Sequence, residues 1–126
     1  AIYIADEPAV IDKKIKAAVT DPQKIRRHDP GHPRICPVYS YQKIFNSSQA
    51  KDIAKECQAG RLGCVDCKSC LAKSLTAYLA PFQERRRSYA QDMPKVRDIV
   101  RDGTAKARQR ARETMKDVRE KMKINY

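Results

Sequence analysis

The sequence predicts an all-α fold, and three observations support this prediction. No stretch of useful length alternates apolar and polar residues as a strand does, whereas several segments repeat apolar residues at helical spacing. The prolines and glycines fall mostly where these segments begin or end. At 126 residues the chain is long enough to bury one hydrophobic core. We therefore expect residues 1–126 to form a single helical bundle with a long Pro-rich loop and two long C-terminal helices.

Residues 1–37 predict one short helix followed by a loop. Asp6 is a candidate cap, and the helix should end near Thr20. Its apolar face consists of Val10, Ile11, Ile15, Ala18 and Val19. Residues 20–37 contain four prolines and a glycine, so we expect a loop there. Loops of this length are more often functional than idle.

Residues 38–60 predict two more short helices. The apolar contributions of the first are Tyr39, Ile44 and Phe45. The second has Ser47 or Ser48 as its candidate cap and Gly60 just beyond its end, a residue typical of helix C-termini.

Two long helices make up the rest of the chain. The first should begin within "GCVDCKSC" and continue to about Gln91, with a kink at Pro81, because proline removes one hydrogen bond of the helix. Its apolar stripe consists of Leu71, Leu75, Tyr78, Leu79, Phe82 and Tyr89. The second should begin near Pro94, and a break at Gly103 is the competing interpretation. The apolar stripe of this second helix is narrow and consists of Val96, Val100, Gly103, Ala107, Ala111, Met115, Val118 and Met122. The small residues in the stripe would let a neighbouring helix approach closely.

The chain is strongly basic, with 27 Lys and Arg against 15 Asp and Glu and a net charge of +12. Such an excess favours nucleic acid as a partner, because Lys and Arg neutralise phosphates and release counterions; the plainer alternative is a solvated helical surface. No apolar run is long enough to span a membrane, and the N-terminus lacks the basic and apolar regions of a signal peptide. We therefore expect a cytoplasmic protein, in which clustered thiols serve metal binding or redox chemistry rather than disulfides.

The five cysteines follow the pattern C-x20-C-x6-C-x2-C-x2-C, at Cys36, Cys57, Cys64, Cys67 and Cys70. Free cysteines in a core are common, but the last three stand among Gly, Asp, Lys and Ser rather than in an apolar run. Zinc takes four tetrahedral ligands, usually from two separated C-x2-C pairs. Overlapping C-x2-C spacings with a remote Cys-Pro are typical of iron–sulfur ligation. The spacing favours an iron–sulfur cluster and leaves zinc as the alternative.

Helix geometry selects four of these thiols. If a helix begins at Cys64, then Cys67 lies one turn along it, whereas Cys70 lies ~9 Å from Cys64 along the axis, beyond the edge of one cluster. The predicted ligand set is therefore Cys36, Cys57, Cys64 and Cys67. The free N–H groups and positive dipole end of a helix N-terminus stabilise thiolates and sulfides, and Arg61 and Lys68 add positive charge.

Four segments resemble, in order, the C-terminal part of the bacterial tryptophanyl-tRNA synthetase family: "IDKKIKAAVTDP", "GCVDCKSCLAKSL", "LAPFQERRRSY" and "ETMKDVREKM". The opening "AIYI" is similar to the residues directly after that family's Lys-Met-Ser-Lys-Ser loop, and the resemblance covers essentially the whole chain. It implies a helical domain that recognises the tRNA anticodon. A subset of the family carries a 4Fe-4S cluster here, with the same spacings as Cys57, Cys64 and Cys67; the spacing before Cys57 is shorter in this chain.

The resemblance implies a homodimeric parent enzyme that activates tryptophan with ATP and transfers it to tRNA. This chain contains neither a His-Ile-Gly-His nor a Lys-Met-Ser-Lys-Ser motif, so we expect a fragment without catalytic residues, whose partners are tRNA and the catalytic domain. The candidate tRNA contacts are Arg85, Arg86 and Arg87 and, on the Pro-rich loop, Arg26, Arg27 and His32. His28 and His32 are the weaker candidates for metal ligands.

Two other functions are compatible with the sequence. One is a freestanding iron–sulfur or zinc protein that binds nucleic acid without catalysis. The other is a helical module whose basic surface meets an acidic protein. Binding to tRNA with a steep salt dependence would separate the second alternative from the nucleic-acid interpretations.

Overall fold

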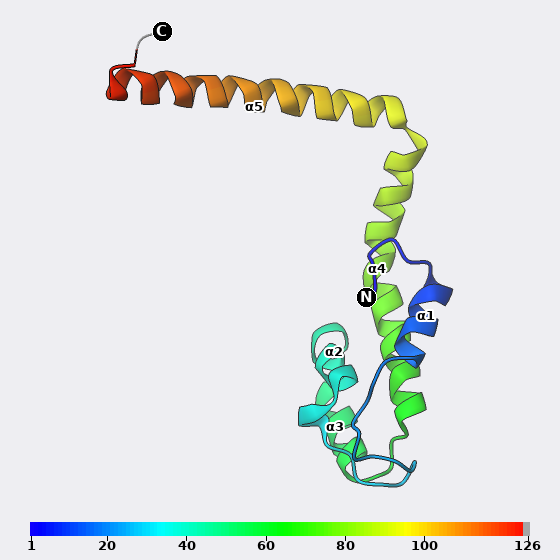
Figure 1. The fold of residues 1–126 in the computed structure, drawn as a ribbon. Helices are drawn as coiled ribbons and strands as arrows, with labels where there is room; N and C mark the ends of the chain where they lie inside the picture. The colour runs from blue at the N-terminus through cyan, green and yellow to red at the C-terminus, as the bar shows by residue number, and fades with distance from the viewer. Residues whose placement is uncertain (125–126) are drawn as a thin grey trace. The chain divides into compact units, whose positions relative to one another are not determined.

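The computed structural model describes residues 1–124, and within them the chain is helical without any strand. The elements, in chain order, are α1 (Pro8–Lys16), the 3₁₀ turn η1 (Pro33–Ile35), α2 (Pro37–Phe45), α3 (Ala50–Gln58), α4 (Cys64–Gln91) and α5 (Met93–Met122) (Figure 1). The predicted all-α fold is confirmed, as are the Pro-rich loop and the two long C-terminal helices.

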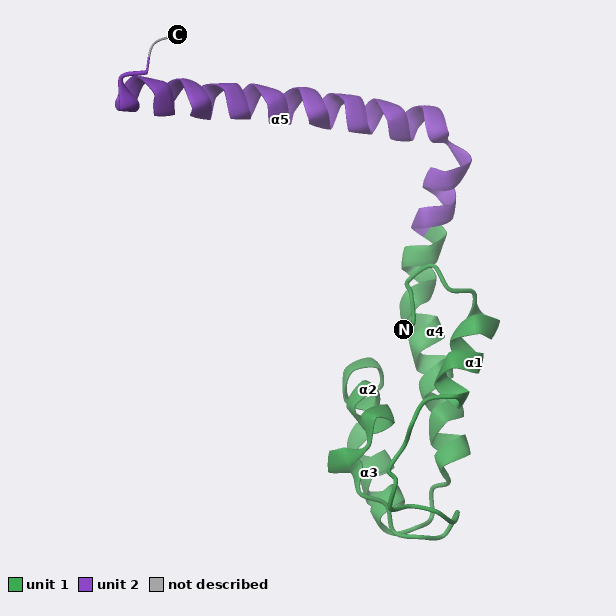
Figure 2. Cartoon of the chain, in the orientation of Figure 1, with its two compact units in different colours: residues 1–84 green, residues 85–126 purple. Residues whose placement is uncertain are grey.

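The chain divides into two compact units, residues 1–84 and residues 85–126 (Figure 2). The first contains α1, α2, α3 and most of α4, and it holds the hydrophobic core. The second contains the end of α4 and the whole of α5. The sequence-based assignment of residues 1–126 to one domain stays a prediction.

The core of the first unit joins three helices. Its buried apolar residues are Ile11 and Ile15 of α1, Val38 of α2, and Leu71, Ala72, Leu75 and Leu79 of α4. On α1 and α4 these residues are three or four positions apart, so each helix presents one apolar stripe. Each fully buried Leu or Ile stabilises the fold by about 1.5–3 kcal/mol relative to an exposed one. This packing holds α1 and α2 against the first half of α4.

Several predicted core positions are wrong. Val19 is 73% exposed because α1 ends at Lys16, before the stripe predicted for it is complete. On α2, Ile44 is 69% exposed, and the helix packs instead through Val38 and the polar Gln42, which lie one turn apart. Of the three predicted residues only Ile44 is exposed; Phe45 packs against the core as expected, and Tyr39 is half-buried.

The predicted helix caps are only partly correct. Asp6 does not cap α1; its carboxylate accepts hydrogen bonds from the backbone N–H of Tyr3 (2.8 Å) and from Nζ of Lys14 (2.6 Å). The N-cap residue of α3 is Gln49 rather than a serine, and its side chain makes no capping bond. Gly60 follows α3 with a φ of 70°, as a glycine beyond a helix C-terminus commonly does.

The last helix continues without a break at Gly103 from Met93 to Met122, so the alternative of a broken helix is wrong. None of its described residues is buried. A Cβ added at Gly103 would meet no neighbouring segment within 4 Å, so the described chain contains no helix packed against the small residues of the stripe. Pro81 lies inside α4, which continues to Gln91. No helix of the described residues is long and apolar enough to cross a membrane.

Candidate metal centre and basic surfaces

The four cysteines of the predicted ligand set line one small pocket of the first unit. Cys36 directly precedes α2, Cys57 lies in the last turn of α3, and Cys64 and Cys67 lie in the first turn of α4. The remaining walls are formed by residues of the Pro-rich loop and of the helices around it: Thr20, Asp21, Lys24, Val38, Tyr39, Ile53, Leu62 and Gly63. Tertiary structure thus brings together four thiols from three separate segments.

The fifth cysteine lies elsewhere. Cys70 does not line the pocket; its sulfur accepts a hydrogen bond from the amide of Asn46 (3.3 Å) and lies 3.7 Å from Oε1 of Gln49. The separation follows from the geometry of α4, because Cys70 lies nearly two turns beyond Cys64 on that helix. The predicted ligand set excludes Cys70 for the same reason.

Two of the pocket thiols, those of Cys57 and Cys67, have raised pKa values because they are partly buried. Burial raises the pKa of Cys67 to about 11; a hydrogen bond from Gln42 lowers it in part, and the nearby Cys36 and Cys57 raise it further. Burial also raises the pKa of Cys57, against the opposing positive charge of Lys24. A metal that binds thiolates at this pocket must therefore displace protons, which is the usual coupling between metal binding and pH.

The donor set fits a four-thiolate metal group by its chemistry. Soft thiolates are the ligands of both iron–sulfur clusters and structural zinc, and the positive dipole end at the start of α4 favours anionic ligands. As the side chains are placed, no group of three or more His, Cys, Asp or Glu within residues 1–124 is arranged to hold a metal ion. The four thiols share a pocket without converging on one point, so binding requires rotation of their side chains.

Gln42 and Asp21 position the walls of this pocket, and neither was predicted as a site residue. Gln42 is fully buried and donates a 2.8 Å hydrogen bond from its side-chain amide to the backbone carbonyl of Cys67. The buried carboxylate of Asp21 accepts hydrogen bonds from the backbone N–H groups of Gln23 (2.8 Å) and His32 (2.6 Å). The only sequence signal was the Asp-Pro pair at Asp21, since Asp commonly bonds the backbone two residues further on.

The two histidines do not join the thiols. Nδ1 of His32 lies 3.0 Å from a carboxylate oxygen of Asp21, so its ring helps hold the loop. His28 is exposed, and neither histidine lines the cysteine pocket. Next to His32, the backbone N–H of Gly31 donates a 2.9 Å hydrogen bond to the carbonyl of Cys57, and a Cβ at Gly31 would collide with the Cys57 sulfur. A larger residue at position 31 would therefore require the Cys57 side chain to move.

Two of the candidate tRNA-binding arginines lie beside the cysteine pocket. Arg26 and Arg27 line a second groove that also includes Cys64 and the first turn of α4. The guanidinium of Arg27 lies 3.3 Å from the carboxylate of Asp66, and both side chains are more than half exposed. Such an exposed ion pair contributes at most about 1 kcal/mol, so Arg27 remains available to a stronger anion such as a phosphate.

The two cations predicted to lie near the thiols have other partners. The guanidinium of Arg61 forms two hydrogen bonds with the carboxylate of Glu56, at 2.7 and 2.6 Å. Nζ of Lys68 donates a 2.9 Å hydrogen bond to the backbone carbonyl of Lys16, at the end of α1. Arg61 therefore stabilises the turn after α3, and Lys68 stabilises the C-terminal end of α1.

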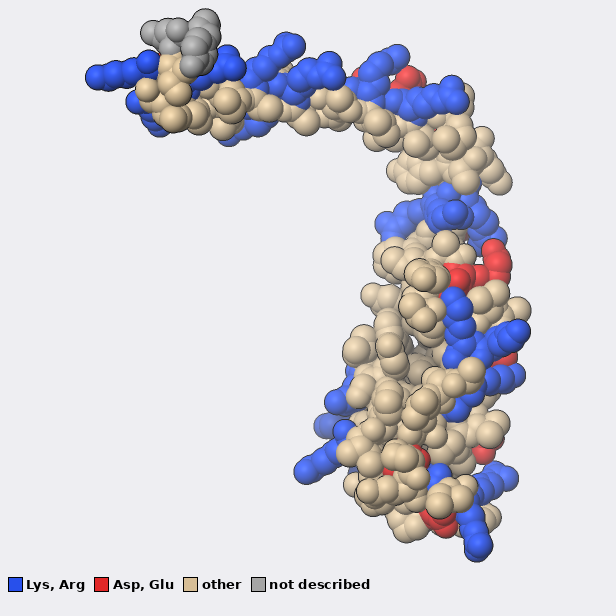
Figure 3. All heavy atoms as spheres, in the orientation of Figure 1, with Lys and Arg blue, Asp and Glu red and all other residues tan. Residues whose placement is uncertain are grey.

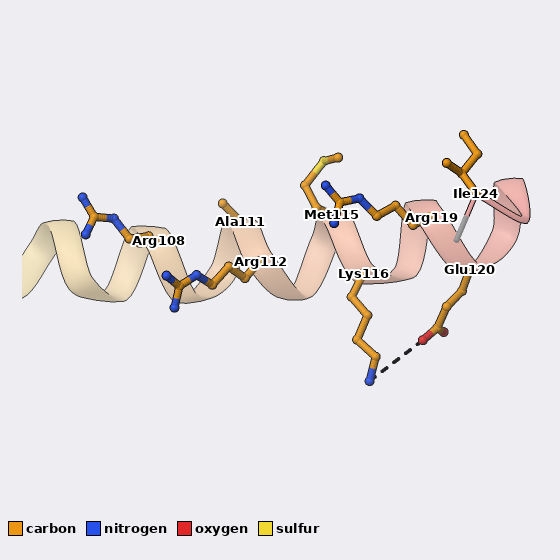
Figure 4. A pocket seen from close by; sticks show the side chains of 8 residues that line it. All are labelled: Arg108, Ala111, Arg112, Met115, Lys116, Arg119, Glu120 and Ile124. Carbon is orange, nitrogen blue, oxygen red and sulfur yellow. Dashed lines mark ion pairs between the residues drawn. The ribbon is translucent and has the colours of Figure 1, made fainter. Parts of the chain in front are cut away.

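The second unit carries a separate basic surface. Arg85, Arg86 and Arg87 are exposed on the last part of α4. Figure 3 shows Lys and Arg side chains along the whole length of α5. Near the end of α5, Figure 4 shows Ala111, Met115 and Ile124 on one side of the helix, whereas Lys116 and Glu120 form an ion pair of 3.9 Å on another. The helix is amphipathic, with a narrow apolar side and a broad basic one.

Comparison with known proteins identifies the family. Residues 1–80 match the family described as tRNA synthetases class I (W and Y). Over 126 residues the chain is 42% identical to tryptophan–tRNA ligase of Aquifex aeolicus, a match that covers 98% of this chain and 32% of the relative. It is 38% identical to the ligase of Thermotoga maritima, with 92% of this chain and 36% of the relative covered. The chain therefore spans about a third of the length of these curated relatives.

The fold is similar to a solved structure as well. The crystal structure of tryptophanyl-tRNA synthetase from Campylobacter jejuni matches with a TM-score of 0.82 and 25% sequence identity, over 98% of this chain and 40% of that one. The family match covers more than half of the chain, and the relatives cover nearly all of it. This chain belongs to the family of class I tRNA synthetases (W and Y), and it corresponds to the C-terminal part of bacterial tryptophanyl-tRNA synthetases.

Proposed function

We propose that this chain is the tRNA-binding part of a tryptophan–tRNA ligase and contributes to recognition of the anticodon. The observation that carries the proposal is the 42% identity to the Aquifex aeolicus ligase across 98% of the chain. The complete enzyme would activate tryptophan with ATP and transfer it to tRNA in the cytoplasm, acting as a homodimer. This part would supply no catalytic residue, and its partners would be tRNA and the catalytic domain.

The distribution of charge supports binding to tRNA. The net charge is +12, and basic side chains occupy both units. Arg26 and Arg27, on the Pro-rich loop, are exposed and share a groove with the first turn of α4, whose positive dipole end favours anions. Arg85, Arg86 and Arg87 are exposed on the second unit. These five arginines are proposed to contact phosphates, which position the RNA and carry no sequence information of their own.

We further propose that Cys36, Cys57, Cys64 and Cys67 hold a 4Fe-4S cluster, with zinc as the alternative. When bound, the group would supply a covalent cross-link between the Pro-rich loop, the end of α3 and the start of α4. The residues around it orient these segments: Gln42 bonds the carbonyl of Cys67, and Gly31 bonds that of Cys57. The expected role is therefore structural, and it keeps Arg26 and Arg27 in place beside Cys64.

Binding of the full chain to RNA tests the tRNA assignment. We would compare the affinity for tRNA specific for tryptophan with the affinity for tRNA of another specificity, at several salt concentrations. Tighter binding of the tryptophan tRNA with a steep salt dependence is expected. The variant Arg26→Gln/Arg27→Gln should weaken binding and reduce the salt slope, whereas Lys55→Gln on α3, whose charge is paired with Asp52, serves as the control. Equal affinity for both RNAs would contradict the anticodon role.

Metal analysis tests the cluster. After anaerobic purification and reconstitution with iron and sulfide, the chain should contain about four iron and four sulfide ions and absorb light near 400 nm. One zinc per chain and no bound iron after reconstitution would favour the zinc alternative. Absence of both metals after reconstitution would contradict a metal centre at the four cysteines.

A further inference from the structure

A lysine is buried in the wall of the cysteine pocket. Lys24 is only 7% exposed, although lysine is almost never buried without a compensating partner. It lines the pocket together with the four candidate ligands, and it is the only cation among the described residues that do so. The candidate metal centre therefore contains one buried positive charge in its own wall.

The Pro-rich loop holds the side chain of Lys24 against the end of α3. The backbone N–H of Lys24 donates a 3.3 Å hydrogen bond to the carbonyl of Asp21, which closes a turn of the loop. A Cβ on Gly31 would lie 3.2 Å from Cδ of Lys24 and would collide with the sulfur of Cys57, so these two side chains meet at one point. Nζ of Lys24 donates a hydrogen bond to the backbone carbonyl of Asp29. The stem of Lys24 is thus fixed beside Cys57, and its ammonium group bonds the loop instead of extending into solvent.

The charge of Lys24 is not cancelled by a carboxylate. Asp21 is the only acidic residue among the described residues that line the pocket. Its carboxylate accepts hydrogen bonds from the backbone N–H groups of Gln23 and His32, and it lies 3.0 Å from Nδ1 of His32. Within residues 1–124, Lys24 forms no ion pair, and its hydrogen bond to Asp29 goes to a neutral carbonyl. A buried charge without an ionic partner favours an anion at the same site.

We propose that Lys24 is the charge-compensating residue of the four-cysteine site and stabilises the net negative charge of the metal–thiolate group held there. Four thiolates leave two net negative charges around Zn²⁺, and they leave the same charge around an oxidised 4Fe-4S core. Arg61 and Lys68 cannot take this role as placed, because they bond Glu56 and the carbonyl of Lys16. The inference rests on the proposed metal centre, since without bound thiolates the lysine would have no anion to compensate.

The hydrogen bond to Asp29 defines a plainer role, in which Lys24 only fastens the loop. Such a clamp is present in the folded chain with and without metal, so it would leave the metal affinity of the folded chain unchanged. A compensating charge acts on the loaded site alone, so its removal should lower the affinity. It should also lower the reduction potential of a cluster, because reduction adds negative charge and a nearby cation stabilises the reduced form.

The test uses the full chain and two probes, Zn²⁺ alone and a cluster reconstituted with iron and sulfide. Competition with a chelator at fixed pH measures the Zn²⁺ affinity, and circular dichroism checks that each variant is folded. Lys24→Met should weaken the affinity about tenfold or more, because charges interact strongly in a poorly solvated site, whereas Lys24→Arg should bind like the wild type. The reduction potential should fall in Lys24→Met and return in Lys24→Arg. Lys55→Met on α3 is the matched control, since Lys55 is exposed outside the pocket.

The outcomes separate this inference from the metal centre on which it rests. If Lys24→Met lowers the urea midpoint of the metal-free chain but changes neither the Zn²⁺ affinity nor the potential, Lys24 is only a clamp and the inference is wrong, while the metal centre stands. If the wild type binds neither Zn²⁺ nor a cluster, the metal centre itself is wrong. If it binds zinc alone, the affinity decides. Should Lys24→Met fail to fold, Lys24→Gln makes the same comparison, because it removes the charge and keeps an N–H donor for the Asp29 carbonyl.

Discussion

The side-chain amide of Gln42 on α2 donates a 2.8 Å hydrogen bond to the backbone carbonyl of Cys67 on α4. Gln42 also accepts a 3.2 Å hydrogen bond from Asn46, whose amide contacts the sulfur of Cys70 at 3.3 Å. All the residues of this network belong to the first unit. Because α2 begins directly after Cys36, the hydrogen bond between Gln42 and Cys67 links the segment that carries Cys36 to the helix that carries Cys67.

Replacing Gln42 should destabilise the first unit. Gln42→Leu removes the bond to Cys67 and leaves the buried amide of Asn46 with one acceptor fewer. Each of the two lost hydrogen bonds contributes about 0.5–1.5 kcal/mol, so the free energy of unfolding should fall by about 1–3 kcal/mol. Urea unfolding followed by circular dichroism measures it. Gln58→Leu, at the exposed end of α3, should change stability little; equal effects of the two substitutions would contradict a special role for Gln42.

The carboxylate of Asp21 should make the fold acid-sensitive. Burial would raise its pKa, but hydrogen bonds from the backbone N–H groups of Gln23 and His32 and from the His32 ring hold it below its usual value. The unfolded chain therefore takes up the proton first as pH falls. The stabilisation is complete well above the unfolded pKa of about 3.9, and it is lost as pH falls towards the folded-state pKa.

Two variants separate this effect from general acid denaturation. Asp21→Asn should lower the urea midpoint at pH 7 and weaken its dependence on pH below about 4.5, relative to the wild type. Asp117→Asn, on the exposed surface of α5, should leave both unchanged. An unaltered pH dependence in Asp21→Asn would show that other carboxylates govern acid unfolding.

Two glycines should respond to alanine with opposite signs. Gly60 has a φ of 70°, and a Cβ there would collide with the carbonyl oxygen of His28, so Gly60→Ala should destabilise the chain by more than about 1 kcal/mol. Gly103 lies in the middle of α5 with open space around it, so Gly103→Ala should stabilise that helix by about 0.5–1 kcal/mol. Thermal unfolding of each variant measures these changes. Destabilisation by Gly103→Ala would indicate that a segment packs closely against this glycine in solution.

Serine substitutions should distinguish the four pocket cysteines from the fifth. After reconstitution, Cys67→Ser should lose bound metal because the pocket then offers three thiols. Cys70→Ser should keep it, since the sulfur of Cys70 lies against Asn46 and Gln49 outside the pocket. Metal content per folded chain is the measurement. The reverse pattern would mean that the metal is ligated from the Cys70 side of α4.

The helical fold class and the separation of Cys70 from Cys64 could be predicted because they depend on local regularities. Helical spacing of apolar residues, together with residues typical of helix ends, indicated the five α-helices, and the rise per residue of an α-helix is enough to separate Cys70 from Cys64. The cap of α1 and the inward position of Ile44 on α2 were predicted wrongly. Asp6 does not cap α1 because its carboxylate bonds Lys14 and Tyr3 instead. The orientation of α2 is decided by contacts with α4, whose residues are distant in sequence.

By itself, the sequence determined the helical class, the long loop, the basic character and the family resemblance, because composition, periodicity and ordered motifs are properties of the chain alone. Only the tertiary structure decided which faces turn inward. Burying Val38 and Gln42 of α2 against α4 leaves Tyr41 and Ile44 exposed, and brings Phe45 to Tyr78 across a long gap in sequence. A nine-residue helix is compatible with more than one inward face, and its partners select the one that satisfies both apolar burial and the hydrogen bonds of Gln42.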